Sequence, residues 1–384
     1  MRPIPRRRFL VHSTLVAGAG ALHGPQLLAR PEAPLVAVPE VRLKRLSKGA
    51  NVCGWFRFAP KASPEHFRNY IPESEAQEMA RLGLRHVRLC IVPPMVMDPA
   101  TGALLEDRVR EVEAAIARFH RAGLLVVVDP HNEDRKVELD PAWQDAFVRF
   151  WGAFAARLSV MDPDLTVLET VNEPVFSGRD AEWNALNERL LAAMRRAAPA
   201  HTLMTSGPGW GGIDGLLKLK PVADRNVVYS FHCYDPFPFT HQGATWAGPD
   251  VKPLRGVPYP SSPEAVAGLL PGLEASPGSK ALVEKYGSER WNRERLAARF
   301  RQGIDWGAWN GVPLYCGEFG VYPPFAKPED RAAWFRDFGG VLADNRIGWA
   351  VWGWDEGFGL NRTHRNGRPA VDSVVASALG LKTA

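Results

Sequence analysis

Two glutamates, Glu173 and Glu318, each follow an apolar stretch and could work together as an acid and a nucleophile. Glu173 stands in the sequence LETVNEP, and Glu318 stands in YCGEFG. Hydrolysis of a glycosidic bond uses such a pair: one carboxylic acid protonates the leaving oxygen, and the other carboxylate attacks C1 or activates water. Each glutamate taken alone could instead cap a helix or join a structural ion pair. The chemistry therefore depends on whether the fold brings the two carboxyl groups together.

Further polar and aromatic residues lie at the ends of apolar stretches. They are Arg88, His131, His232, Tyr234 and Trp352. A packed core does not need polar groups gathered at one end of its strands, so we interpret this set as the wall of a site. The histidines and glutamates could alternatively bind a metal ion, but the sequence has no His-x-His or His-Glu-x-x-His spacing. We expect neither a metal nor an organic cofactor.

Short β-rich stretches alternate with amphipathic stretches from residue 49 onward, and this alternation predicts the elements that position the site. The predicted strands cover residues 50–56, 86–91, 124–129, 166–171, 202–206, 227–233, 313–316 and 348–352. The predicted helices cover residues 74–82, 108–121, 141–158, 181–197, 213–219, 293–309, 328–344 and 370–379.

Repeated strand–helix units need parallel strands, because each return of the chain requires a crossover. Several strands are apolar on consecutive residues, which indicates that both faces are covered. Eight units predict an α/β fold of the (β/α)₈ TIM barrel type, in which all strand ends that carry the polar residues meet at one mouth. An open doubly wound sheet is the alternative. We expect one catalytic domain over residues 31–384.

One segment departs from the alternation. Residues 235–290 hold many prolines and glycines and show no clear period, which predicts a long loop after strand six, on the catalytic side of a barrel. The segment carries His241 and Trp246, and we expect one of them to contact a sugar away from the bond that is cut. A merely tolerated surface insertion is the alternative.

The motifs together resemble glycoside hydrolase family 5, the large cellulase family. Asn-Glu-Pro after an apolar strand, then Gly-Glu-Phe-Gly far downstream, match its pattern over nearly all of the chain after residue 49, and the phrase HCYDPF is most similar to bacterial endoglucanases. The resemblance implies that Glu173 is the acid/base and Glu318 the nucleophile of a retaining endo-β-1,4-glucanase. β-Mannan, xyloglucan and mixed-linkage glucan remain possible substrates, and a non-catalytic sugar-binding barrel is the alternative of another class.

The same resemblance implies roles for the surrounding residues. Asn172 binds the sugar 2-hydroxyl, and Arg88 and Tyr234 hold Glu318. His131 and His232 line the reacting subsite, and Trp352 stacks beneath the sugar. Glu169 lies four residues before Glu173, so it shares the inward strand parity, and we predict a buried carboxylate paired with a cation.

The first thirty residues have the features of an export signal. The basic run RRRFL precedes a short apolar stretch rich in alanine and glycine, a pattern similar to the twin-arginine type. We therefore expect a signal peptide over about residues 1–30 and a periplasmic or extracellular protein, without stable membrane insertion. Much of the formal net charge of +5 lies in this stretch, which argues against a nucleic-acid partner. We expect a monomer whose partner is a β-glucan.

The four cysteines, Cys53, Cys90, Cys233 and Cys316, lie far apart in apolar stretches and include no Cys-x-x-Cys. Export permits disulfides, but neighbouring strands of a parallel sheet rarely offer the required geometry. We expect four buried free thiols.

Overall fold

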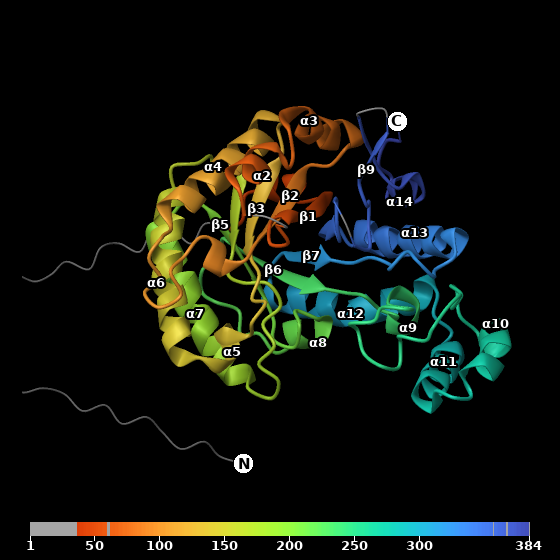
Figure 1. The fold of residues 1–384 in the computed structure, drawn as a ribbon. Helices are drawn as coiled ribbons and strands as arrows, with labels where there is room; N and C mark the ends of the chain where they lie inside the picture. Colours follow the sequence, from red (N-terminus) through yellow and green to blue (C-terminus); the bar gives the residue numbers. More distant parts are fainter. Residues whose placement is uncertain (1–36, 60–61, 356, 366–367, 384) are drawn as a thin grey trace, which may run out of the picture. The chain divides into compact units, whose positions relative to one another are not determined.

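Eight parallel strands close into a barrel in the order β1 to β8 (Figure 1). The computed structural model describes residues 37–59, 62–355, 357–365 and 368–383. The (β/α)₈ prediction is confirmed, and the open sheet is wrong. The strands are β1 Gly49–Phe56, β2 His86–Ile91, β3 Leu125–Pro130, β4 Thr166–Glu169, β5 Thr202–Ser206, β6 Val227–His232, β7 Leu314–Glu318 and β8 Gly348–Val351.

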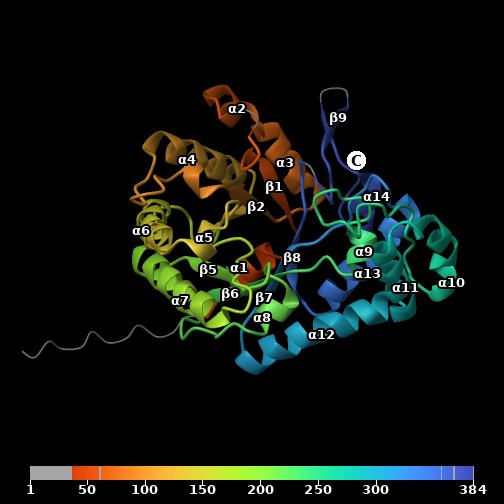
Figure 2. The same cartoon turned by 60° about the horizontal axis from the view of Figure 1, so that its bottom comes forward.

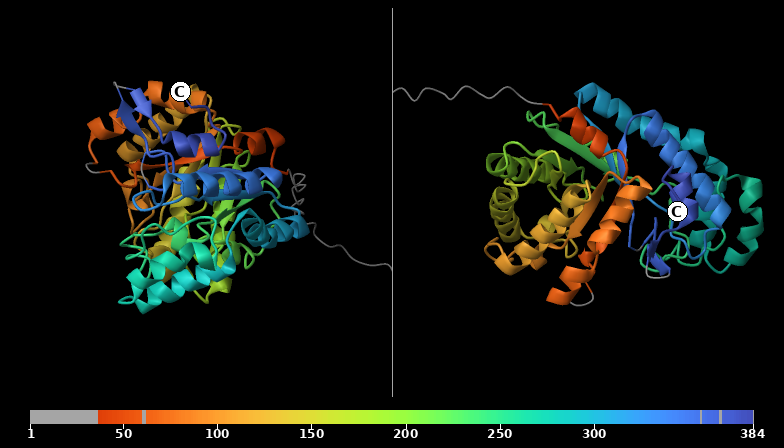
Figure 3. Two further views of the ribbon diagram at one scale, coloured as in Figure 1. Left: turned by 90° about the vertical axis from the view of Figure 1, so that its right-hand side faces the viewer. Right: turned by 90° about the horizontal axis from the view of Figure 1, so that it is seen from above.

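Helices surround the strands on the outside (Figures 2 and 3). The longer ones that follow the strands are α3 Glu73–Leu82, α4 Glu106–Arg121, α6 Pro141–Leu158, α7 Asp180–Ala197, α12 Arg293–Asn310 and α13 Pro328–Asp344. The shorter elements are α1 Glu40–Arg45, α2 Pro64–Asn69, η1 Pro93–Met95, α5 Lys136–Leu139, α8 Ile213–Leu216, α14 Ser373–Ala378 and a two-stranded sheet of β9 Thr363–Arg365 and β10 Arg368–Ala370. Among the described residues, none of the helices has the length and apolar character that crossing a membrane requires.

Alternate residues of each strand face opposite sides, and this parity separates two apolar layers. Val126 and Val128 of β3 pack in the large cluster between the strands and the helices. Leu125 and Val127 belong to a smaller cluster inside the barrel, which Leu46, just after α1, joins from one end. The parity of Leu125 and Val127 also turns Asp129 inward, so the barrel interior changes from apolar to charged toward the strand ends. All four cysteines are buried and free, as predicted.

The segment after β6 is more ordered than its sequence indicated. It contains α9 Phe237–Thr240, α10 Pro263–Val266, η2 Ala267–Leu273 and α11 Pro277–Glu289. The prediction of a long loop without period is therefore wrong for its second half. The helix α11 buries Ser279 and Gly287 besides Val283 and Tyr286, so small residues dilute its apolar period. Figures 1 and 2 show α10 and α11 side by side at the outer edge, near the start of α12. The signal peptide predicted for residues 1–30 lies outside the described residues.

Candidate active site

The carboxyl groups of Glu173 and Glu318 meet at the mouth of the barrel. Glu318 is the last residue of β7, and Glu173 follows the end of β4 by four residues. One carboxylate oxygen of each and a ring nitrogen of His232, the last residue of β6, all lie within 4.8 Å of one another. Residues far apart in the sequence thus form one constellation, because the ends of parallel strands share one edge of the barrel.

Glu318 is surrounded by groups that favour its ionised form. Arg88 Nη1 donates to its Oε1 at 2.8 Å, and the Tyr234 hydroxyl donates to its Oε2 at 3.0 Å. Burial by itself raises the pKa of Glu318, but the positive charges of His232 and Arg88 outweigh it and lower the pKa to about 2. The carboxyl group is therefore a carboxylate at any ordinary working pH.

Glu173 experiences the opposite balance. Burial and, next in size, the negative charge of Glu318 raise the pKa of Glu173, although His232 Nδ1 lies 2.8 Å from its Oε1. Burial also lowers the pKa of His232, but the charges of Glu318 and Glu173 raise it by more. Two carboxyl groups at one place with opposite shifts are what an acid and a nucleophile require.

Arg88 is fully buried and organises the floor of the site. Its guanidinium donates to both oxygens of Glu169, at 2.8 and 3.1 Å, and to Asn172 Oδ1 at 2.7 Å. It also lies 3.1 Å from Asp129 Oδ2. Glu169 is thus the buried, ion-paired carboxylate that the strand parity predicted, and it is fully shielded from solvent.

His131 does not reach the cleft. It is 1% exposed and lies behind Trp352, with 5.8 Å between the ring centroids, while its Nε2 is 2.6 Å from Asp129 Oδ2. Burial, helped by the charges of Arg57 and Arg88, holds the pKa of His131 well below its usual value, so the ring is neutral. The side chain of His131 is not among those that line the cleft, and its place in the reacting subsite stays a prediction. Arg88 reaches the cleft through Glu318 and Asn172.

An open cleft of about 800 Å³ lies over the two glutamates. Of the predicted residues, its lining includes Asn172, His232, Tyr234, His241, Trp246 and Trp352. Trp246 is 63% exposed, so much of its indole ring is accessible to a ligand. A sugar offers flat C–H faces to such a ring. The cleft therefore combines aromatic walls with the carboxyl groups of Glu173 and Glu318, while a third carboxyl group, that of Asp235, is paired with Arg299.

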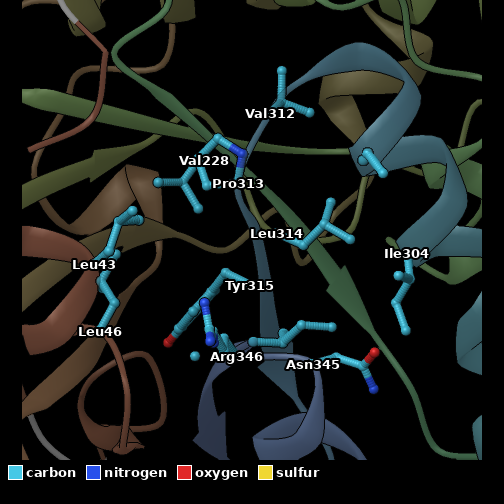
Figure 4. A pocket seen from close by; sticks show the side chains of 14 residues that line it. Leu43, Leu46, Val228, Ile304, Val312, Pro313, Leu314, Tyr315, Asn345 and Arg346 are labelled. Atoms are coloured by element: carbon cyan, nitrogen blue, oxygen red, sulfur yellow. The ribbon is translucent and has the colours of Figure 1, made fainter. Parts of the chain in front are cut away.

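A second cavity, of about 230 Å³, has a different character (Figure 4). Leucine, isoleucine and valine side chains from α1, α12 and the starts of β6 and β7 make up most of its wall, with Tyr315, Asn345 and Arg346 as its polar members. It contains no carboxyl group, so it has no counterpart of the acid pair in the cleft.

Sequence reasoning missed two prominent residues of the cleft. Arg57 directly follows the last residue of β1, and its guanidinium lies 5.1 Å from the Trp352 ring centroid. Trp210 follows β5, is 57% exposed and has a positive φ of 63°. Both lie just beyond a strand, so the rule that located Glu173 could have found them.

The described residues offer two groups whose donor atoms are close enough for a metal ion. One is Glu173, His232 and Glu318, and the other is Cys90, Asp129 and His131. Arg88 lies 2.8 Å from the Glu318 carboxylate and 3.1 Å from that of Asp129. A cation in either group would therefore sit beside a guanidinium that already neutralises the carboxylate, which disfavours its binding.

Comparison with known proteins identifies close relatives. Residues 47–357 match the Cellulase family (glycosyl hydrolase family 5). Endoglucanase C of Acetivibrio thermocellus is 30% identical over 314 residues, 79% of this chain and 90% of that protein. Cellodextrinase A of Ruminococcus flavefaciens is 27% identical over 317 residues, 80% of this chain and 85% of that protein.

Solved structures agree with the fold. Cel5A of Thermotoga maritima in complex with cellobiose superimposes with a TM-score of 0.72 at 25% identity, covering 88% of this chain and 98% of that one. The complex of the same enzyme with mannotriose superimposes with a TM-score of 0.70 at 25% identity and the same coverage.

Proposed function

Because the chain belongs to glycosyl hydrolase family 5 and is therefore a glycoside hydrolase, we propose that it cleaves β-1,4-linked glucan with retention of configuration. Glu318 is the nucleophile, and Glu173 is the general acid and then the general base. The observation that carries this proposal is the pair of opposite pKa shifts, lowered at Glu318 and raised at Glu173, on carboxyl groups within 4.8 Å. Membership of this family also argues against the non-catalytic sugar-binding barrel.

In the first step a Glu318 oxygen attacks C1 of the sugar while the Glu173 carboxylic acid gives its proton to the leaving oxygen. The C1–O bond to the leaving sugar breaks, and an ester between the glycan and Glu318 forms. Glu173 is then ionised and takes a proton from water as the water oxygen attacks C1 and releases Glu318. One carboxylate oxygen of Glu173 and one of Glu318 lie within 4.8 Å of each other, which supports this double displacement. Inversion would need the two carboxyl groups to be about 6.5–9.5 Å apart, to leave room for a water molecule.

Neighbouring residues fit the roles that the resemblance implies. Asn172 Oδ1 accepts from Arg88, so its amide N–H₂ is the group that can donate to a sugar 2-hydroxyl in the cleft. Trp352 lines the cleft and offers a face for the sugar at C1. His232 and Tyr234 contact the carboxyl groups themselves, so changes there act on charge as well as on shape.

β-1,4-Glucan is the proposed substrate because the relatives named above are endoglucanases and a cellodextrinase. The Thermotoga enzyme was solved with mannotriose as well as cellobiose, which supports β-mannan as the second candidate. Release of reducing ends from carboxymethyl cellulose, barley β-glucan, xyloglucan and mannan distinguishes the two, and a falling viscosity early in the reaction indicates internal cleavage.

The assignment of the two glutamates is tested by leaving-group dependence. Glu318→Ala should lose nearly all activity on every substrate. Glu173→Ala should keep activity toward a dinitrophenyl glycoside, whose leaving group needs no proton, and azide should accelerate its turnover because it needs no base. A rescued Glu318→Ala would reverse the roles. An inverted first product, observed by NMR, would refute the retaining mechanism.

We further propose that the protein is exported through the twin-arginine route as a monomer. The support for export is the RRRFL sequence followed by an apolar stretch. Replacement of Arg6 and Arg7 by lysine should leave the activity in the cytoplasm of the producing cell, and light scattering on the purified protein reports the oligomeric state.

A further inference from the structure

The segment that carries Glu173 leaves β4 in a conformation that few residues adopt. Glu173 and Phe176 both have a φ of 38°, in the left-handed region that side chains other than glycine disfavour. Such a conformation persists only where surrounding contacts hold it. Those contacts therefore determine where the Glu173 carboxyl group lies.

Hydrogen bonds hold this segment from two sides. Two backbone N–H groups of the loop after β5 donate to the carbonyl oxygens of Val175 and Pro174, at 2.8 and 3.2 Å. From the side of β3, Pro130 accepts the N–H of Asn172 at 2.8 Å. Among the side chains that contact the segment, Glu138 holds the backbone just after the acid, because its Oε1 accepts the N–H of Val175 at 3.0 Å.

Glu138 lies in the short helix α5 and is 1% exposed. Asn132 Nδ2 donates to both carboxylate oxygens of Glu138 at 2.9 Å. The backbone carbonyl of Glu138 accepts a hydrogen bond from Arg179 Nη2, also at 2.9 Å. Its side chain thus ties the loop after β3 to the segment that carries the acid. A carboxylate buried against neutral donors is costly, so the packing of α5 alone gives no reason for a glutamate here.

We propose that Glu138 is a positioning residue for the general acid. By holding the N–H of Val175, two residues after Glu173, it fixes the backbone from which the Glu173 carboxyl group reaches the leaving oxygen. Proton transfer depends steeply on donor–acceptor distance, so a small shift of this segment lowers the rate of the acid-assisted step. The inference rests on the proposed role of Glu173.

The test compares kcat/KM on two aryl cellobiosides. Glu138→Ala should lower kcat/KM for phenyl β-cellobioside, whose leaving group needs a proton, by about tenfold to a hundredfold. It should lower kcat/KM for dinitrophenyl β-cellobioside by less than about threefold, because that leaving group departs unaided. Glu138→Gln keeps one acceptor for Val175 and should recover most of the loss.

The control is Asp140→Ala. Asp140 lies two residues further along and accepts N–H groups of Ala142 and Trp143 at 3.0 and 3.1 Å, so it caps α6 and does not contact the segment of Glu173. This variant should lose thermal stability and change both substrates alike. If Glu138→Ala does not fold, Glu138→Gln is measured in its place. Its loss of kcat/KM should be smaller and confined to the phenyl substrate.

Equal losses on both substrates, or none on either, would overturn the positioning role. Glu173→Ala measured in parallel separates this failure from that of the proposed function. If Glu173→Ala also shows no preference for the activated substrate, then Glu173 is not the acid. If it shows that preference and Glu138→Ala does not, only the inference about Glu138 is wrong.

Discussion

Arg88 shares one guanidinium among three carboxyl groups, and their different surroundings decide which of them keeps its charge. Burial raises the pKa of Asp129 to about 6 and that of Glu169 to about 7, in spite of Arg88. Glu318 also has His232 beside it, and its pKa is about 2. As pH falls, the two shielded acids bind protons first, so Arg88 remains available to Glu318 through the range in which a glycosidase works.

The Tyr234 hydroxyl supplies the second hydrogen bond to Glu318 and can be removed alone. Tyr234→Phe should raise the pKa of Glu318, because the lost O–H donor stabilised only the charged form. The acid limb of the kcat/KM profile should therefore move to higher pH, and kcat/KM at its optimum should fall about tenfold. Tyr259→Phe is the control, because its hydroxyl donates to Asp337 outside the cleft. An unmoved acid limb would show that Tyr234 does not set the charge of Glu318.

The sequence could predict which residues reach the barrel mouth but not which of them touch the cleft. Glu173, Glu318 and His232 follow from strand ends alone. The packing of His131 against Trp352 depends on how the segments after β3 and β8 meet, and no spacing in the sequence encodes that. The resemblance predicted that Arg88 holds Glu318. Its bidentate contact with Glu169 could be deduced only from the register of β2, β3 and β4 in the structure.

At the scale of elements, each predicted strand was located to within two residues at either end, because consecutive apolar residues mark strands buried on both faces. The six long amphipathic helices were located equally well, whereas α8 and α14 were each predicted three residues too long at one end. The helices in the second half of the segment after β6 were not predicted, because α10 and α11 cover only the edge of the barrel and bury few large side chains. Its first half supplies the part of the cleft wall that contains His241 and Trp246.

We expect the cleft wall that contains His241 and Trp246 to contribute to the binding of long substrates. Trp246 lines the cleft, lies nearly perpendicular to the Tyr322 ring with 4.8 Å between ring centroids, and is 63% exposed. Trp246→Ala should raise KM for cellohexaose about tenfold or more and change hydrolysis of a short activated aryl glycoside little, because remote contacts contribute binding to long chains only.

Trp309→Ala is the matched control for this wall. Trp309 is 91% exposed on α12 and does not line the cleft, so its loss should leave both substrates unchanged. Equal activity of Trp246→Ala and the parent on both substrates, with unchanged thermal stability, would show that the segment after β6 is only a tolerated surface insertion.

At the scale of the whole molecule, the same burial that shifts the catalytic groups makes the fold sensitive to acid. Burial lowers the pKa of His86 to about 3, of His201 to about 4 and of His241 to about 3. Below the unfolded value near 6.5, the unfolded chain binds protons at these positions and the folded chain does not, so stability falls as pH falls. Glu318 acts in the same direction below about pH 4.5.

The buried acids of the Arg88 network act in the opposite direction. Because burial raises the pKa of Asp129 and Glu169 above the unfolded values, the folded state binds more protons between about pH 4 and pH 7, and these two groups favour folding on the acidic side of that window. The contributions oppose each other there, so we expect a broad stability maximum at about pH 5–7. Below about pH 4 the unfolded acids are protonated as well, and the histidines and Glu318 then make stability fall steeply.

His201 offers the cleanest test of this balance, because it lies next to the start of β5, at the end of the barrel away from the cleft. His201→Leu removes a group that the unfolded chain protonates and the folded chain does not. The melting temperature should therefore fall less between pH 6.5 and pH 4 than it does in the parent, by a few degrees. Leu203→Ala, at a buried residue of β5, should lower the melting temperature by similar amounts at both pH values, since it removes no titrating group. If His201→Leu showed the full acid sensitivity of the parent, the pKa of His201 would not be lowered by folding, and the acid lability would have to come from His86, His241 and Glu318.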